Sequence, residues 1–287
     1  MAHYFGPTTR SCHDSPIFVP KIKSVKPMGK VFSVVNQKGG TSKSALTVNL
    51  AVGLAREGKK VLIIDADPQA DASASLGYRE TDESDETLTE LFGNVLNDEA
   101  LPEDSYINHQ AEGVDVIVSN IDLAGMEVLL VNALSREYVL KQIVDRVRDE
   151  YDVVIIDTMP SLGMLTINSL AAADEVIIPV EASYLPIKGL QKLLQTVGRI
   201  RKQINPALQV GGIVFAMVDI RTCEARDNME LLREGYGNSV KIFDTYIPVS
   251  VRMKECCKEG KSIYEYAPAS RVAKAYEALT GEVILNV

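Results

Sequence analysis

The chain has 287 residues, enough for one large α/β domain or two small ones, with the 46% hydrophobic and 24% charged composition of a globular protein. No run approaches the roughly 20 apolar residues of a membrane span, the four cysteines form no disulfide framework, and the N-terminus has no signal-peptide core. Composition therefore argues against membrane-spanning and disulfide-stabilised classes and predicts a cytoplasmic protein.

The formal net charge of −9 is concentrated in one segment. Ten acidic residues and no Lys or Arg lie between Glu80 and Asp104. In the rest of the chain, 29 acidic residues face 30 basic ones, so the remaining surface is close to neutral. The acidic total therefore does not exclude local basic patches or a nucleic-acid partner.

Residues 1–29 contain four prolines and a small basic excess without periodicity, which predicts a flexible basic N-terminal arm. From Lys30 onward, short apolar runs alternate with helical patterns. Strands are predicted at 31–36, 61–65, 113–119, 151–157, 175–180 and 211–219, with short extended pieces at 240–244 and 245–248. Helices are predicted at 43–57, 121–150 (one or two), 163–173, 186–203, 222–235 and from about Ser270. The acidic segment, at about 80–104, is interpreted as a solvated insertion with a short helix near 86–93.

This alternation predicts an α/β fold with a doubly wound, mostly parallel β-sheet and helices on both faces. Continuous apolar strands are typical of a sheet that is covered on both sides. The simplest organisation is a single domain over residues 30–287.

The loop between the first predicted strand and helix reads Lys38-Gly39-Gly40-Thr41-Ser42-Lys43-Ser44. Phosphate binding needs converging backbone N–H groups, a helix N-terminus behind them and a lysine for the terminal phosphates, and this loop offers all three. It departs from the general pattern G-x-x-x-x-G-K-[ST], because Gln37 and Ser42 occupy the two glycine positions. On the loop alone, a chance Gly-Gly turn remains an alternative.

Three ordered blocks together resemble the ParA/MinD family of deviant Walker A P-loop ATPases. They are KGGTSKS at 38–44, DADPQ at 65–69 and VVIIDTMPSLG at 153–163. FAMVDIRT and YIPVSVR resemble the family's C-terminal nucleotide- and DNA-binding region, so the resemblance covers roughly residues 30–280. It implies a P-loop ATPase domain of the ParA/Soj type, with ATP and Mg²⁺ as ligands.

The resemblance also implies a role for each motif residue. Lys43 would contact the β- and γ-phosphates, while Ser44 and Asp157 would hold Mg²⁺. Lys38 would reach the nucleotide of a second subunit across an ATP-bound homodimer, and Asp67 would orient the attacking water. The residues expected to contact nucleotide are Lys38, Gly39, Gly40, Thr41, Ser42, Lys43, Ser44, Ala45, Met217 and Pro248. Met217, Asp219 and Pro248 lie where the resemblance places adenine contacts, with apolar packing at a strand end as the alternative role. For Asp65 and Asp67, helix capping or strand-end solvation is the alternative role.

Some positions depart from the family pattern, among them Ser42 in place of glycine, Ala45 and Met159. If position 42 requires a positive φ, serine there costs ~1–2 kcal/mol, roughly ten-fold in affinity. These departures predict a weak ATPase that depends on a partner.

A basic helix face points to DNA. The stretch from Ala182 to Val218 has five basic residues and no acidic one, and four of the five recur at helical spacing. The resemblance adds two arginines in the C-terminal part. The predicted contacts to DNA phosphates are Lys188, Lys192, Arg199, Lys202, Arg221 and Arg252. A solvated helix face is the alternative interpretation.

The combined hypothesis is a chromosome- or plasmid-partitioning ATPase. It would form an ATP-sandwich dimer, bind DNA non-specifically, associate with the nucleoid and be stimulated by a ParB-like centromere-binding partner. The chain after Lys274 lacks the basic amphipathic membrane anchor of the MinD branch, and the blocks lack the cysteines of the nitrogenase-reductase branch. Two alternatives stay open: a positioning ATPase for a protein or membrane cargo, and a P-loop metabolic or cofactor-assembly enzyme.

Overall fold

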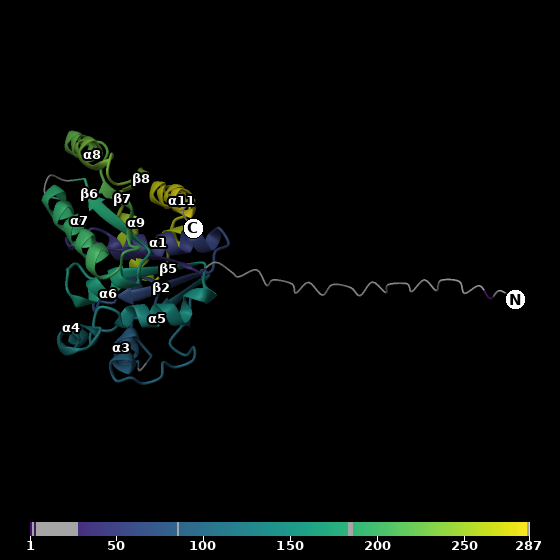
Figure 1. Ribbon diagram of the computed structural model, residues 1–287. Helices are drawn as coiled ribbons and strands as arrows, with labels where there is room; N and C mark the ends of the chain where they lie inside the picture. The colour runs from purple at the N-terminus through teal and green to yellow at the C-terminus, as the bar shows by residue number, and fades with distance from the viewer. Residues whose placement is uncertain (2, 4–27, 85, 183–185, 286) are drawn as a thin grey trace.

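The computed structural model describes residues 1, 3, 28–84, 86–182, 186–285 and 287. One sheet runs through it in the order β3-β4-β2-β5-β1-β6-β7-β8 (Figure 1). The strands are β1 (Lys30–Val34), β2 (Val61–Ala66), β3 (Asn108–His109), β4 (Val114–Ile117), β5 (Val153–Thr158), β6 (Glu175–Glu181), β7 (Gln209–Val218) and β8 (Ile242–Pro248). All neighbouring strands are parallel except the β3–β4 pair. The predicted doubly wound, mostly parallel sheet is confirmed.

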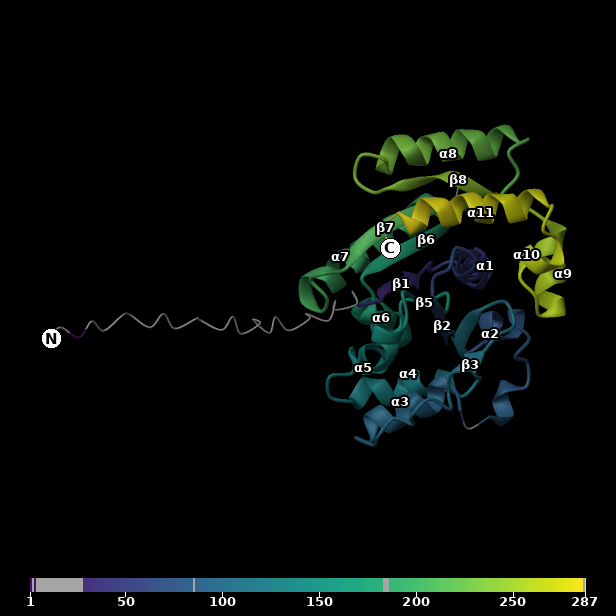
Figure 2. The ribbon, with the colours of Figure 1, turned by 90° about the vertical axis from the view of Figure 1, so that its right-hand side faces the viewer.

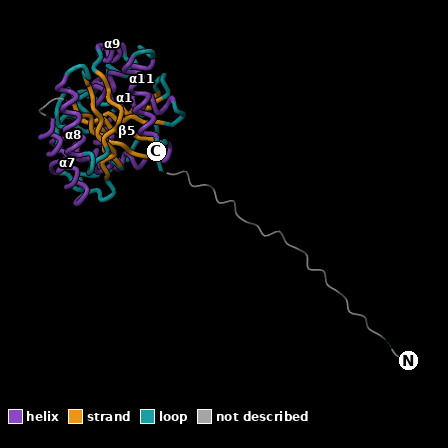
Figure 3. The backbone as a smooth tube through the Cα atoms, turned by 90° about the horizontal axis from the view of Figure 1, so that it is seen from above, coloured by secondary structure: helices purple, strands orange, loops and turns teal. Residues whose placement is uncertain are grey.

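Helices cover both faces of this sheet. The α-helices are α1 (Lys43–Arg56), α2 (Asp71–Ser75), α3 (Leu88–Leu96), α4 (Leu123–Asn132), α5 (Val139–Val147), α6 (Met164–Ala172), α7 (Pro186–Gln203), α8 (Cys223–Tyr236), α9 (Val251–Glu259), α10 (Ile263–Tyr266) and α11 (Arg271–Ile284). Short 3-10 turns occur at Thr81–Glu83 and Arg148–Glu150. In Figure 2, α1 and α11 lie on one side of the central strands and α5 and α6 on the other. The view from above shows the strands enclosed between the helices (Figure 3).

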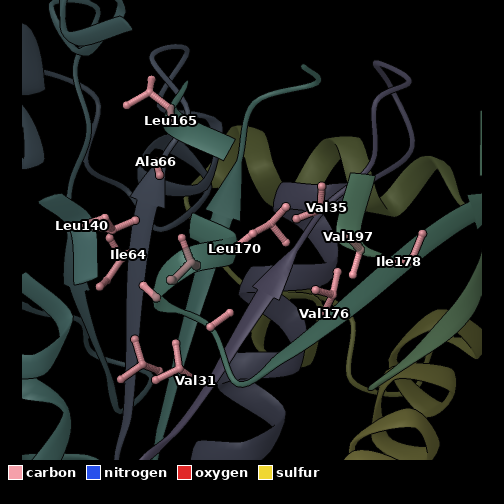
Figure 4. Packing of buried hydrophobic residues seen from close by; sticks show 14 of the residues in the cluster. Val31, Val35, Ile64, Ala66, Leu140, Leu165, Leu170, Val176, Ile178 and Val197 are labelled. Carbon is pink, nitrogen blue, oxygen red and sulfur yellow. The ribbon is translucent and has the colours of Figure 1, made fainter. Parts of the chain in front are cut away.

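Alternate side chains of each strand pack into two separate hydrophobic cores, one on each face of the sheet. In β1, Val31 packs with Ile64 and Leu170 in the cluster under α3 to α8 (Figure 4). The next residue, Phe32, packs with Leu50 in the opposite cluster, under α1 and α9 to α11. Successive strand residues point to opposite faces, so an uninterrupted apolar strand stabilises both layers at once.

The strand order places a crevice at the end of β1. This strand lies between β5 and β6, and the carboxyl ends of the parallel strands share one edge of the sheet. At that edge Asp65 on β2 is in register with Asp157 on β5, and Asp157 is in register with Val34 on β1. Ligands of open α/β sheets bind in such a crevice. The register therefore brings two of the motif blocks beside the phosphate loop.

The acidic segment is less solvated than expected. The predicted helix is present as α3, but Leu88, Leu91 and Phe92 are buried in the core. The segment therefore contributes apolar side chains to the core, and its acidic side chains border it. Most of the predicted flexible arm, residues 2 and 4–27, lies outside the described residues. No helix in the described ranges is long and apolar enough to cross a bilayer.

Candidate nucleotide-binding site

A strained loop joins β1 to α1. Gly40 and Ser42 both have left-handed backbones, with φ of 72° and 64°. The Asn36 side chain anchors the loop, since Nδ2 donates to the Pro179 carbonyl at 2.6 Å and Oδ1 accepts from the Lys38 amide at 3.0 Å. Ser42 is the N-cap of α1, but its side chain caps no amide. The first amides of α1 are therefore left for an anion.

Position 42 has the positive φ at which serine is strained, and this carries a prediction for stability. Ser42→Gly should raise the free energy of unfolding by about 1 kcal/mol, because left-handed strain of roughly 1–2 kcal/mol exceeds glycine's entropy cost. Urea denaturation measures the difference. Ser270→Gly is the control: Ser270 has φ of −70° and caps the Ala273 amide, so glycine there should lower stability. A Ser42→Gly protein no more stable than the parent would refute the strain.

Lys43 points a buried ammonium group into the same crevice. The residue is only 6% exposed, and burial lowers the pKa of its side chain. The carboxylates of Asp157, Asp67 and Asp71 oppose this shift and favour the charged form. A cation removed from water in this way interacts strongly with a phosphate.

Asp157 offers an unused carboxylate oxygen. It is fully buried, and burial followed by the charge of Asp65 raises its pKa to about 8, while the neighbouring Ser44 hydroxyl acts in the opposite direction. Oδ1 accepts from Thr47 Oγ1 at 3.1 Å, whereas Oδ2 has no hydrogen-bond partner among the residues that the structure describes. A buried, unsatisfied carboxylate oxygen beside a serine hydroxyl suits Mg²⁺, which prefers hard oxygen donors and retains water. Ser44 and Asp157 therefore fit the magnesium role expected of them.

Asp65 and Asp67 have different surroundings. The Asp65 carboxylate accepts from the Ser73 amide at 2.8 Å and the Ser73 hydroxyl at 2.7 Å, which ties β2 to α2. That is the capping role considered as the alternative. Among the described residues, the Asp67 carboxylate accepts a hydrogen bond only from the Gln69 amide, at 3.0 Å, and it lies in the cleft with Lys43 nearby. Burial raises the pKa of Asp67, with Lys43 acting against it.

A cleft of about 570 Å³ joins the phosphate loop and Asp67 to the C-terminal part of the chain. Residues 40–45 and Asp67 line one part of it, and Met217 and Pro248 line another. Met217 has a left-handed backbone, φ 53°, where the β7–β8 pairing is irregular. The structure therefore brings two of the three expected adenine contacts, Met217 and Pro248, into the cleft that holds the phosphate loop, whereas Asp219 does not line it. Sequence reasoning missed the further lining residues Gln69, Asp71, Ser75, Pro160, Ile247, Val249, Ser250, Met253, Lys254, Cys257 and Tyr276.

Lys38 lies at the rim of the loop. Its ammonium group pairs with Glu181 at the end of β6, and its side chain is 47% exposed. The Thr41 hydroxyl donates to the Lys38 carbonyl at 3.2 Å, which fixes the backbone between them. Glu181 is 143 residues away in sequence, and no motif pointed to it.

The predicted DNA contacts fall into three places. On α7, Lys192, Arg199 and Lys202 are exposed, opposite buried Leu193 and Val197; the Lys188 side chain lies outside what the structure describes.

Arg221 forms a two-pronged contact with Asp219, at 2.8 Å from Nε and 2.7 Å from Nη2, which lowers the pKa of Asp219 to about 2. This carboxylate would compete with a DNA phosphate for Arg221. Arg252 lines a second cavity of about 650 Å³ together with Arg271, beside the first cleft.

Comparisons with known proteins agree with this geometry. A family model described as an AAA domain, AAA_31, matches residues 29–210. The chain is 40% identical over 259 residues to the sporulation initiation inhibitor protein Soj of Bacillus subtilis, covering 90% of this chain and 100% of Soj. It is 38% identical over 257 residues to the chromosome-partitioning ATPase Soj of Treponema pallidum, covering 90% and 98%. The crystal structure of cobyrinic acid a,c-diamide synthase from Mycobacterium smegmatis with bound ATP analogue and magnesium has a TM-score of 0.78 and 30% identity, covering 89% of this chain and 94% of that one.

Proposed function

We propose that this chain, which belongs to the ParA/Soj family of ATPases, is a cytoplasmic partitioning ATPase that binds DNA non-specifically when it carries ATP. The observation that supports this most directly is the cleft itself. It gathers the uncapped start of α1, the buried ammonium of Lys43 and the carboxylate of Asp67, with Ser44 at its wall. These are the groups that phosphoryl transfer requires.

ATP and Mg²⁺ would occupy the cleft in one orientation. The phosphates would lie over the loop from Lys38 to Ser44, with Lys43 on the terminal phosphates. Ser44 and Asp157 would hold Mg²⁺, which supplies positive charge to the leaving phosphate oxygens. The adenine would lie between Met217 and Pro248. The relative from M. smegmatis was solved with an ATP analogue and magnesium, which supports this pair of ligands.

Hydrolysis would depend on a second subunit. Asp67 would orient the attacking water, and Lys38 would stabilise the phosphate of the facing subunit in an ATP-bound homodimer. Within one chain, the ammonium of Lys38 is engaged by Glu181. Dimer formation would therefore have to exchange this carboxylate for a phosphate, an exchange that slows turnover in the absence of a stimulating partner. A ParB-like protein would be that partner.

The exposed basic face of α7 would contact DNA and retain the protein at the nucleoid. Neutralising the four α7 residues by Lys188→Gln, Lys192→Gln, Arg199→Gln and Lys202→Gln should weaken DNA binding and spare ATP binding. If each residue contacts one phosphate, the salt dependence of log K should fall by about 3.6. Fluorescence anisotropy across a salt series, with and without ATP, measures this slope.

The control neutralises Arg226 and Arg233, exposed on α8, which should leave the slope unchanged. Equal DNA affinity of the α7 variant and the parent would transfer the role to the Arg252 and Arg271 cavity. An absence of DNA binding in every nucleotide state would favour a positioning ATPase for a protein cargo.

A metabolic enzyme is the second candidate, because the M. smegmatis synthase shares the fold at 30% identity. The relative from Treponema pallidum, named a chromosome-partitioning ATPase and 38% identical, favours partitioning. Turnover of ATP that increases with DNA and a centromere-binding protein would support partitioning. An ATP-dependent change in a small-molecule acid would support a metabolic enzyme.

A further inference from the structure

The solvent face of α4 carries no charge. Ile121, Val128, Leu129, Val131 and Leu134, on α4 and its flanks, are between 50% and 94% exposed. Ala124 and Gly125 lie one turn before Val128, and a side-chain carbon added at Gly125 would meet open space. We call these seven residues the α4 face. A surface helix ordinarily presents polar side chains to water, so an exposed apolar face of this kind marks an interaction site.

The single charged side chain of α4 is turned away from this face. The Glu127 carboxylate accepts from the Met164 amide at 3.1 Å and the Leu165 amide at 2.9 Å. These two amides begin α6, whose N-cap Gly163 has no side chain of its own. Gly163 also approaches closely, since an added side-chain carbon would lie 2.5 Å from Glu127. Glu127 therefore acts as the N-cap of α6 from a neighbouring helix.

The start of the α4 face is bordered by acidic residues. The Asp82 carboxylate accepts from the Ile121 amide at 3.1 Å, and Asp82, Glu86 and Asp122 are exposed. Helix α3 packs beside α4, so the acidic segment of the sequence adjoins the apolar face (Figure 1).

At the other end, Arg136 is already engaged: Nη1 donates to the Val131 carbonyl at 2.7 Å and Nε to Glu137 at 3.1 Å. The rim of the α4 face is thus acidic at one end and neutralised at the other.

We propose that the α4 face docks an amphipathic helix of a partner protein, apolar along one side and carrying Lys or Arg at the end that lies over Asp82 and Asp122. The apolar side would cover Val128, Leu129 and Val131, and the small residues Ala124 and Gly125 would allow close approach. The acidic rim selects the partner. A second copy of this chain would offer no free basic end to Asp82 and Asp122, because Arg136 at the other end of its own α4 face is already engaged, and an anionic membrane would be repelled.

Docking on α4 would reach the nucleotide. Glu127 connects α4 to the start of α6, and the loop before α6 follows β5, the strand that carries Asp157, the proposed magnesium residue. A helix held on the α4 face would fix the position of Glu127 and so restrain this loop. This second step rests on the proposed function, whereas docking itself does not.

A synthetic amphipathic helical peptide tests the docking step. It carries leucines on one face and lysines at one end, and a twin carries glutamates in place of the lysines. By fluorescence anisotropy the full-length protein should bind the lysine peptide at least about ten-fold more tightly than the glutamate twin, a preference that falls with salt. The double variant Val128→Ser, Leu129→Ser should bind the lysine peptide about ten-fold or more weakly than the parent does. Leu231→Ser, at a 49% exposed leucine on α8, is the matched control and should change nothing.

Several outcomes would overturn the proposal. Equal binding of the two peptides would show that the acidic rim does not recognise the partner. Equal binding by the serine variant and the parent would show that the α4 face does not. Self-association seen by analytical ultracentrifugation and lost in the serine variant would make a second copy the occupant. Co-sedimentation with vesicles of phosphatidylcholine and phosphatidylglycerol, lost in that variant, would make it a membrane surface.

The coupling step has its own readout, independent of ATP turnover. The lysine peptide should slow amide exchange at residues 159–165 in the parent. In Glu127→Gln, which weakens the cap but keeps the α4 face, the peptide should bind with unchanged affinity and leave that exchange unaffected. Equal slowing in both proteins would exclude Glu127 as the link. An inactive parent that still bound the peptide would count against the proposed function alone.

Discussion

Lys43→Ala is expected to abolish measurable ATP binding. The ammonium group is buried in the cleft and belongs to the first residue of α1, so its removal leaves the phosphates facing Asp67 and Asp157. A hydrogen bond to a charged group contributes roughly 1.5–3 kcal/mol, and the repulsion adds to it, so affinity should fall by at least about 100-fold. Isothermal titration calorimetry with Mg·ATP measures the loss.

The comparison variant is Lys274→Ala, an exposed lysine on α11, which should bind ATP as the parent does. Circular dichroism and urea denaturation establish that Lys43→Ala is folded. Removing a buried cation carries little risk to folding, because the pKa of Lys43 is already lowered by burial. A folded Lys43→Ala protein with parental ATP affinity would refute the phosphate-loop assignment.

Asp67→Ala is expected to retain ATP binding while turnover falls by at least about 100-fold, the scale of a lost positioning or proton-accepting group. Its carboxylate makes one backbone contact, to the Gln69 amide, and otherwise faces the cleft. Because ATP would persist in the site, light scattering should report a dimer that does not decay after ATP addition. Phosphate release and light scattering on the same sample measure both effects.

Two further carboxylates sharpen the test. Asp227→Ala, at an exposed position on α8, should hydrolyse ATP like the parent. Asp65→Asn should act on stability instead, because Asp65 holds the Ser73 amide and hydroxyl. If Asp67→Ala turned over ATP at the parental rate, the water-orienting role would have to be assigned elsewhere.

The layered fold could be predicted because its signals are local. Continuous apolar runs marked β2 and β5, and α7 has the predicted bounds, 186–203. Helix α9 was missed: its sequence VRMKECCKE has no strong apolar stripe, and Ser250 at its N-cap makes no side-chain bond. The extended pieces at 240–244 and 245–248 form one strand, β8, whose irregular pairing with β7 has no sequence signature.

Of the candidate site, only the residues within sequence motifs could be predicted. The loop, Asp67 and Asp157 belong to recognisable blocks, and the structure brings them together at the end of β1. The Lys38–Glu181 pair joins residues that are 143 positions apart in the sequence. The Glu127 cap reaches the start of α6, at least 37 positions away. Such contacts depend on strand order, which the alternation of elements does not specify. The buried leucines of α3 show the same limit, because acidic neighbours concealed an apolar stripe.

The cleft is walled by segments that lie far apart in the sequence. The phosphate loop leaves the ribosome first, whereas Pro248, Met253 and Tyr276 are synthesised much later. A nascent chain that ends before residue 240 would have a place for phosphates and Met217, but it would lack the opposite wall of the base site. Stabilisation by bound nucleotide would therefore begin only after this wall is made, and ATP would favour chains that contain it over chains cut before it.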